Sequence, residues 1–495
     1  MIQLPAPDPR TLARRAEIAA AMRAIVPDGT IADEATLTAY DRDAFSAYSQ
    51  RPLVCVLPAS ADQVSAVLAY AARENIRIVP RGAGTSLSGG ALPLGDGILL
   101  GLTRMNRILD VDFENRCAVV QPGVTNASVT KAVQGKGFYY APDPSSQIAC
   151  TIGGNVAENS GGIHCLKYGL TTQNLMGVEL VLMNGERVRL GGKHAGDGGL
   201  DLLSVVCGSE GLLGVVTEAT LRILPRPPVT RTLLIAYDTV RAAGETVAAI
   251  IAAGVIPAAL EFMDRRCIAT VEAFCAPGYP QDAEAILIAE IDGMPVEVED
   301  DARRISEIAH GLGATSIRDC VDEAERSRVW SGRKAAFGAM GRLEPDMLCM
   351  DGTIPRRALP DVLAKISELS GQYGLVCCNV FHAGDGNLHP LIVFDCMRPG
   401  ELERAESFGA DILKLCVAMG GVLTGEHGVG VEKKALMGEM FSDTDLAQQE
   451  RLKCAFDGQG LLNPGKVFPT LHACVELGRM HVHGGRLPFP NLPRL

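Results

Sequence analysis

PRGAGTSLSGG, residues 80–90, directly follows the β-rich run IRIVP (76–80). Glycines let successive backbone N–H groups point into one concavity and let a pyrophosphate approach the chain closely. The glycine spacing does not match the dinucleotide fingerprint G-x-G-x-x-G, and the G-K-[ST] of a P-loop is missing. Taken alone, the stretch therefore fits a phosphate-binding loop and a plain structural turn equally well.

Two further glycine-rich stretches follow in the same region. PDPSSQIACTIGGNVAENSGGIHCLKYG covers residues 142–169, and GSEGLLGV covers residues 208–215. Three such loops within about 130 residues indicate a long ligand that is held largely by backbone contacts.

Around these loops the pattern predicts an α+β protein of several domains. RPLVCVLP (51–58) reads as a buried strand, Ser60 with Gln63 as a capping box that starts a helix, and IRIVP as the next strand. This is a β-α-β unit with a parallel pair. The proline cluster at 225–228 marks the clearest boundary. We expect a helical lead-in at 1–50, a first domain at 51–228, an α+β domain at 229–470 and a tail at 471–495.

Composition excludes some classes of partner. The chain has 46 basic and 58 acidic residues and a net charge of −12, which argues against nucleic acid or an anionic membrane as the main partner. It has fifteen cysteines, no C-x-x-C pair and no secretory signal pattern at the start, so we expect reduced thiols and a cytoplasmic protein. The longest apolar run, 248–260, is too short to span a bilayer. Membrane contact would go through a partner.

Two histidines flank a predicted turn in the second half. GLVCCNVF and LHPLIVFD are β-rich, and AGDGN between them is turn chemistry, so His382 and His389 should meet at the mouth of a hairpin. Two imidazoles offer half of a divalent metal site, and Glu426 in GEHG (425–428) would complete three ligands with one open position. The alternative is a pair of histidines that cap the turn, with Asp385 and Asn387 as ordinary turn formers.

Together, these motifs resemble the flavin-binding domain of the vanillyl-alcohol oxidase/PCMH family. The second-half motifs are most similar to those of its D-2-hydroxyacid dehydrogenases, in particular the FAD-bearing catalytic subunits of bacterial glycolate oxidases. The resemblance implies a PCMH-type FAD-binding domain followed by an α+β substrate domain with an antiparallel sheet. The loop 81–90 contains Thr85 and Ser86 but no histidine tether, so we expect non-covalent FAD. The residues that the resemblance places around FAD are Arg81, Gly82, Ala83, Gly84, Thr85, Ser86, Gly89, Gly90, Pro144, Ser145, Gly153, Gly154, Asn155, Asn159, Gly162, Tyr168, Gly169, Glu210, Gly211, Gly214, Val215 and Asn463.

The resemblance also assigns roles in the second half. It implies a metal, with zinc as the family expectation, on His382, His389 and Glu426. His427 would be the general base, since a histidine of near-neutral pKa suits removal of a hydroxyl proton; the alternative is a hydrogen-bonding role around the metal. Arg333, in the helical stretch 323–340, would bind the substrate carboxylate.

Two departures from relatives that use 2-hydroxyglutarate indicate a small substrate. Where those relatives carry a lysine, just before DGTIPRR, this chain has Cys349 and Met350, and Phe337 stands in place of a threonine. A monocarboxylate such as glycolate, or D-lactate as the alternative, therefore fits better than a dicarboxylate. Two alternatives come from other classes of protein: a metal-dependent hydrolase and a non-catalytic flavin-binding subunit.

Electrons must leave the chain, because no cysteine grouping fits an iron–sulfur cluster and no haem motif is present. The resemblance implies two partners, an iron–sulfur subunit and a second flavoprotein-like subunit. The tail MHVHGGRLPFPNLPRL (480–495) is a candidate docking segment, and its His481 and His483 are a weak metal signal. Any contact with the inner membrane would go through these partners.

Overall fold

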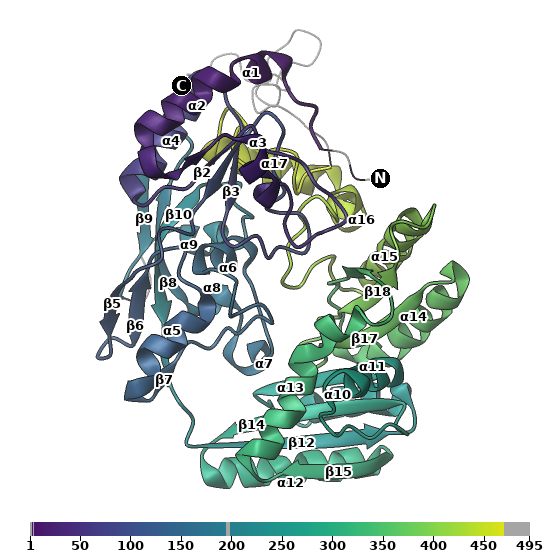
Figure 1. Cartoon of the computed structure of the whole chain (residues 1–495). Helices are drawn as coiled ribbons and strands as arrows, with labels where there is room; N and C mark the ends of the chain where they lie inside the picture. The colour runs from purple at the N-terminus through teal and green to yellow at the C-terminus, as the bar shows by residue number, and fades with distance from the viewer. Residues whose placement is uncertain (1, 3, 195–198, 470–495) are drawn as a thin grey trace, which may run out of the picture.

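The computed structural model describes residues 2, 4–194 and 199–469 of the 495. The tail from 471, with the proposed docking segment, lies outside the described residues. Figure 1 shows two lobes: two sheets built by the first half of the chain, and a third sheet built by the second half.

The first sheet has four strands in the order β1-β2-β4-β3. The strands are β1 (Thr30–Ile31), β2 (Val54–Val56), β3 (Ile78–Arg81) and β4 (Ile98–Gly101). Helix α4 (Ala61–Glu74) joins β2 to β3, and Ser60 caps it as predicted. The predicted parallel pairing of these two strands is wrong in one respect, because β4 lies between them and is parallel to both. Residues 1–50 also contribute β1, so they are more than a lead-in.

The second sheet is antiparallel, with five strands in the order β5-β6-β10-β8-β9. Its strands are β5 (Ile108–Asp112), β6 (Cys117–Val120), β8 (Leu175–Val181), β9 (Arg187–Gly191) and β10 (Val215–Arg222). A two-strand ribbon, β7 (Phe138–Tyr139) with β11 (Leu224–Pro225), closes this half. The glycine-rich loops connect elements of the first two sheets, which brings them to one side of the first lobe.

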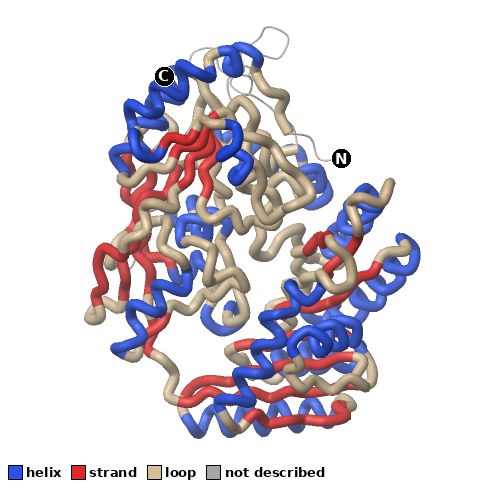
Figure 2. Tube along the Cα trace, viewed as in Figure 1, coloured by secondary structure: helices blue, strands red, loops and turns tan. Residues whose placement is uncertain are grey.

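The third sheet is a seven-stranded antiparallel sheet in the order β15-β12-β14-β13-β17-β18-β16. Its strands are β12 (Val229–Tyr237), β13 (Ala259–Asp264), β14 (Ala285–Gly293), β15 (Ala314–Cys320), β16 (Asp346–Cys349), β17 (Val376–His382) and β18 (Pro390–Phe394). Helices cover both faces (Figure 2). Alternate residues of β12 therefore enter two cores, Leu233 and Ile235 on one side and Leu234 on the other.

The helices fall into two groups along the chain. The first half has α1 (Pro9–Ala13), α2 (Arg15–Ile25), α3 (Glu34–Leu37), α4, α5 (Asn126–Val133), α6 (Ile152–Glu158), α7 (Cys165–Tyr168), α8 (Thr171–Asn174) and α9 (Leu202–Val206). The second half has α10 (Val240–Ala252), α11 (Arg265–Cys275), α12 (Pro295–Gly311), α13 (Glu323–Met340), α14 (Leu359–Tyr373), α15 (Glu401–Ala418), α16 (Met437–Met440) and α17 (Asp443–Phe456). This mixture of helices and mainly antiparallel sheets confirms the α+β class.

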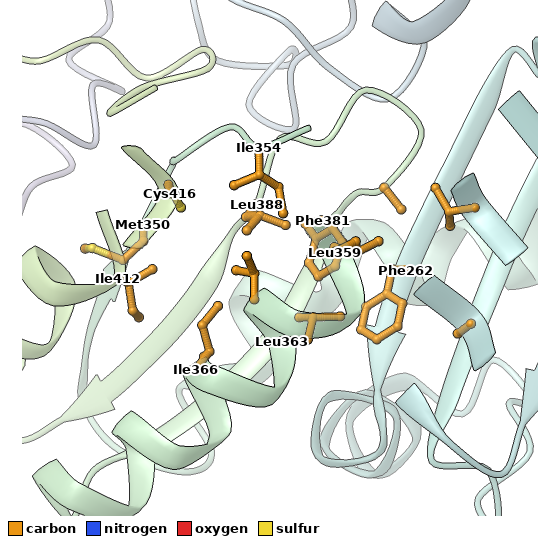
Figure 3. Packing of buried hydrophobic residues seen from close by; sticks show 14 of the residues in the cluster. Phe262, Met350, Ile354, Leu359, Leu363, Ile366, Phe381, Leu388, Ile412 and Cys416 are labelled. Carbon is orange, nitrogen blue, oxygen red and sulfur yellow. The ribbon is translucent and has the colours of Figure 1, made fainter. Parts of the chain in front are cut away.

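The core under the β17–β18 hairpin is apolar. Leu359, Leu363 and Ile366 follow one another at helical spacing on α14 and turn towards the sheet (Figure 3). They share a cluster with the stacked rings of Phe262 and Phe381, whose centroids are 4.7 Å apart. Phe262 follows Glu261 on β13, and Phe381 precedes His382 on β17. The packing of the two rings therefore holds in place the strands that carry Glu261 and His382.

The end of the described chain returns to the first lobe. Leu462 forms a bridge with Ile78 of β3, and the Lys453 ammonium donates to the carbonyl of Leu212 at 2.6 Å. In Figure 1 the yellow α17 accordingly lies with the N-terminal elements. Sequence patterns gave no sign of this return, and the predicted range 229–470 contains a segment that packs on both lobes.

The thiols are mostly as expected. Thirteen cysteines in the described part of the chain are free, and most of them are buried. Among the helices in the described ranges, we find none with the length and apolar character needed to cross a membrane.

Candidate active site

A cavity of about 390 Å³ lies between the two lobes. Its walls combine the three glycine-rich loops of the first lobe with Lys334, Phe337, His389, Glu426 and His427 of the second. The structure thus brings the proposed cofactor loops and His427, the proposed general base, to one cavity.

Sixteen of the twenty-two residues predicted to surround the cofactor line this cavity: Arg81, Gly82, Ala83, Gly84, Thr85, Ser86, Gly90, Pro144, Ser145, Gly153, Gly154, Asn155, Glu210, Gly211, Gly214 and Val215. The other six do not: Gly89, Asn159, Gly162, Tyr168, Gly169 and Asn463. Some of these six support the loops. Asn463 donates to the carbonyls of Gly90 and Glu210, and Tyr168 donates to Asp292 on β14.

Unpartnered polar atoms show that the first-lobe wall suits a polar ligand. Thr151 Oγ1, both side-chain polar atoms of Asn155, and Glu158 Oε2 are buried without a hydrogen-bond partner, and all three residues line the cavity. Buried polar groups of this kind are normally satisfied, so a ligand with its own donors and acceptors fits here. FAD, with its pyrophosphate, ribityl chain and ring heteroatoms, has this character.

The predicted hairpin is present. β17 and β18 pair antiparallel, and His382 bridges to Asn387, which places His389 diagonally across from His382. The two rings have centroids 5.1 Å apart and planes nearly perpendicular at 87°. Their Nε2 atoms lie 3.4 Å and 3.0 Å from the same oxygen, Oε1 of Glu426. The three side chains offer ligand atoms within 4.8 Å of one another.

The other nitrogen of each ring is already bonded. His382 Nδ1 lies 2.7 Å from Glu261 Oε1, and His389 Nδ1 lies 3.3 Å from the carbonyl of Met350. Metal-binding histidines usually make this kind of second bond, because it fixes the tautomer and leaves Nε2 free for the ion. The donor set therefore fits a divalent cation such as zinc, although it does not choose between metals.

His389 also belongs to a second possible metal-binding group, with Cys349 and His427. In that grouping the rings of His389 and His427 stack almost parallel, 9° apart, with centroids 4.9 Å apart. An ion must lie in the plane of each ring that binds it, so two parallel rings cannot both bind one ion without rotating. We therefore prefer the grouping with His382 and Glu426.

One carboxylate accepts hydrogen bonds from the turn that carries Glu426 and His427. Asp351 follows β16, is fully buried, and accepts the backbone N–H groups of Gly425 at 3.1 Å, Glu426 at 3.2 Å and His427 at 2.9 Å. The Thr424 hydroxyl also donates to it. Sequence reasoning missed Asp351, although it is the aspartate of the quoted motif DGTIPRR.

His427 lines the cavity next to the proposed metal ligands. Burial lowers the pKa of His427 to about 4, against the opposing effect of Asp351. The expectation of a near-neutral pKa is therefore wrong for this structure. The imidazole is neutral at physiological pH, and its Nδ1 has no hydrogen-bond partner. A neutral, unpartnered ring nitrogen on a cavity wall can accept a proton.

Arg333 does not lie where the prediction needs it. Its side chain is 1% exposed, its Nε donates to Glu261 Oε2 at 2.6 Å, and it is absent from the cavity wall. Its neighbour Lys334 lines the cavity together with Phe337. The helix α13 thus presents a different cation to the cavity from the one predicted.

Comparison with known proteins places these features in a family. The family described as "FAD binding domain" matches residues 52–191, and "FAD linked oxidases, C-terminal domain" matches residues 226–467. Glycolate oxidase subunit GlcD of Escherichia coli (strain K12) is 55% identical over 455 residues, which is 92% of this chain and 91% of that protein. The chain belongs to the FAD-linked oxidases. The resemblance to catalytic subunits of glycolate oxidase is confirmed, and FAD is the cofactor of this oxidoreductase family.

Other relatives of this FAD-linked oxidase carry two kinds of name. Glycolate oxidase subunit GlcD of Bacillus subtilis (strain 168) is 40% identical over 87% of this chain and 92% of its own. A D-lactate dehydrogenase of Archaeoglobus fulgidus is 33% identical over 84% of this chain and 92% of its own. Both names describe enzymes of 2-hydroxy acids.

Solved structures confirm the PCMH-type fold of the FAD-linked oxidase. 4-Ethylphenol oxidase from Gulosibacter chungangensis superposes with a TM-score of 0.79 at 19% identity, covering 94% of this chain and 99% of that one. p-Cresol methylhydroxylase gives a TM-score of 0.78 at 17% identity, covering 94% and 98%.

Proposed function

We propose that this FAD-linked oxidase converts a small D-2-hydroxy acid to the 2-oxo acid, with glycolate to glyoxylate as its main reaction. The observation that carries the proposal is the cavity itself, where His389, Glu426 and His427 face the glycine-rich loops of the cofactor domain. The named relatives support both glycolate and, as the second candidate, D-lactate. The two substrates differ by one methyl group, a difference worth only about 1–3 kcal/mol in an apolar pocket.

The chain's own residues would divide the work. His427 would take the hydroxyl proton, and the hydride would leave the α-carbon as the carbonyl forms. Bound FAD supplies the hydride acceptor, and a divalent cation on His382, His389 and Glu426 supplies Lewis acidity. The substrate carboxylate would meet a cation of α13, either Lys334 on the wall or Arg333 behind it. Phe337 on the wall, and the buried Cys349 with its Sγ within 4.8 Å of ring nitrogens of His389 and His427, offer no charge to a second carboxylate.

We further propose that FAD is bound non-covalently. The side chain of His164, the histidine of the second glycine-rich stretch, is engaged by Asp143 at 2.8 Å and Glu290 at 3.0 Å, and neither His164 nor Cys165 lines the cavity. Electrons would pass to partner subunits, an iron–sulfur protein and a second flavoprotein-like protein. The relatives named as glycolate oxidase subunits support such an assembly. A cytoplasmic location, with membrane contact through the partners, completes the proposal.

The test of the mechanism is His427→Ala in the FAD- and metal-loaded protein. General-base catalysis is typically worth roughly 10²–10⁴ in rate, so anaerobic flavin reduction by glycolate should slow by about that factor. FAD and metal contents should stay at wild-type levels, because neither needs this side chain. Reduction at the wild-type rate would transfer the base role to another group.

A further inference from the structure

Two carboxylates from opposite lobes hold the backbone of residues 425–430. Asp351, in the second lobe, accepts the N–H groups of residues 425–427. Glu210 lies in the first lobe between α9 and β10. Its carboxylate accepts the backbone N–H groups of Val429 at 2.6 Å and Gly430 at 2.7 Å. Of these two, Glu210 is the one that connects the turn to the cofactor domain.

The position of the Glu210 carboxylate is itself fixed. The residue is 7% exposed, and its backbone lies in the left-handed region at φ 51°. Asn463 of the returning segment donates to its carbonyl at 2.7 Å. Glu210 therefore acts from a rigid site rather than from a mobile loop tip.

Little space remains around the turn. The buried Lys433 ammonium donates to the carbonyl of Gly428 at 2.8 Å, and the N–H groups of Val431 and Glu432 donate to the carbonyl of Ser88, so the backbone on both sides of Glu210's two bonds is held. A Cβ at Gly428, whose φ is +81°, would lie 2.1 Å from Glu158 Oε2 and 2.9 Å from the carboxyl carbon of Glu210. Within this packing, the Glu210 carboxylate is the side-chain group of the first lobe that accepts the N–H groups of residues 429 and 430.

We infer that Glu210 is an interdomain positioning residue, which sets the place of His427 relative to the flavin by holding the two peptide groups that follow the turn. Hydrogen bonds to a carboxylate are short and about twice as strong as neutral ones. The inference rests on the proposed role of His427. It goes beyond that role because it assigns the first-lobe carboxylate to the geometry of the reaction, rather than to cofactor binding as the sequence predicted. A misplacement of about 1 Å can cost up to about 10²-fold in rate.

The test is Glu210→Gln in the full chain loaded with FAD and metal, measured in two ways. Deuterium uptake of the peptide containing residues 421–433 should rise, because one carboxylate oxygen is replaced by the glutamine –NH2 group, which cannot accept a hydrogen bond. The maximal rate of anaerobic flavin reduction by glycolate should fall by about 10–100-fold, with the half-saturating glycolate concentration unchanged. Glu210→Asp keeps the charge but shortens the side chain. Its deuterium uptake and its rate of flavin reduction should lie between those of the wild type and Glu210→Gln.

Asp264→Asn is the matched control. Asp264 accepts the N–H groups of Cys267 at 2.9 Å and Asn379 at 2.7 Å, so the substitution weakens the same type of bond outside the cavity. It should leave the uptake of residues 421–433 and the rate of flavin reduction unchanged.

Unchanged uptake and rate in both Glu210 variants would overturn the inference. So would loss of FAD with an unchanged rate per bound flavin, because Glu210 would then act on cofactor binding. The uptake measurement needs no substrate, so it separates this inference from the proposed function. If deuterium uptake rises in the Glu210 variants but no hydroxy acid reduces the flavin of the wild-type protein, the Glu210 contact is supported and the proposed function is rejected.

Discussion

His382 Nδ1 lies 2.7 Å from Oε1 of Glu261, its direct partner in the register of β17 and β13. The bond orients the imidazole so that Nε2 faces Glu426. Glu261 is completely buried, and its other oxygen binds Arg333, so a buried charge network stands behind the proposed metal ligands.

Glu261→Gln should lower metal affinity by roughly 10–100-fold while FAD stays bound, because support of this kind tunes a metal-binding histidine by about that amount. Metal content after equilibration with a chelator of known affinity measures the change. Glu290→Gln is the matched control, since Glu290 bonds to His164, which is no proposed ligand. Equal affinities in both variants would show that Glu261 does not support a metal site.

Acid precipitation should release the flavin into the supernatant as FAD, because the loop 81–90 contains no histidine and neither His164 nor Cys165 lines the cavity. Absorbance and mass of the supernatant flavin measure this. Flavin that remains in the precipitate would show a covalent link.

Lys334→Ala should raise the KM for glycolate about tenfold or more with little change in kcat, since Lys334 is the cation of α13 on the cavity wall. Arg333→Ala should instead lower the free energy of unfolding by about 3–5 kcal/mol, because it leaves Glu261 as a buried and partly unpaired charge. Steady-state kinetics and thermal unfolding separate the two variants. A KM raised only by Arg333→Ala would assign the carboxylate to Arg333, as the family resemblance implies.

The interface between the lobes should depend on the charge of His164. Burial opposes that charge, but Asp143 and Glu290 raise the pKa of His164 well above its usual value. A raised folded-state pKa gives stability that is fully present below the unfolded pKa of about 6.5 and is lost as the pH rises through the folded value. The Tm difference between wild type and His164→Ala should therefore be largest in mild acid and shrink at alkaline pH. A difference that grows with pH would contradict this assignment.

Much of the fold could be read from the sequence because its signals are local. The N-cap at Ser60, the α13 pattern and the hairpin turn each depend on nearby residues, and all three are present, although Gln63 accepts from Ala59 rather than from Ser60 as a capping box requires. The insertion of β4 between β2 and β3, and the return of residues 453–463 to the first lobe, depend on long-range packing that no local pattern contains.

The site shows the same division. Motif order identified the loops and the trio of His382, His389 and Glu426, which the structure brings together. The low pKa of His427 depends on burial by distant elements, which a spacing argument cannot supply. The exchange of Arg333 for Lys334 on the wall likewise depends on Glu261, a residue that lies 72 positions away in the chain.

The most direct test of the central claim is anaerobic mixing of the FAD- and metal-loaded protein with a panel of 2-hydroxy acids, followed by flavin absorbance. We predict that glycolate bleaches the flavin with one glyoxylate formed per flavin reduced, that D-lactate does so in preference to L-lactate, and that D-2-hydroxyglutarate reacts poorly. Flavin that stays oxidised with every member of the panel, or that D-2-hydroxyglutarate reduces fastest, would contradict the account.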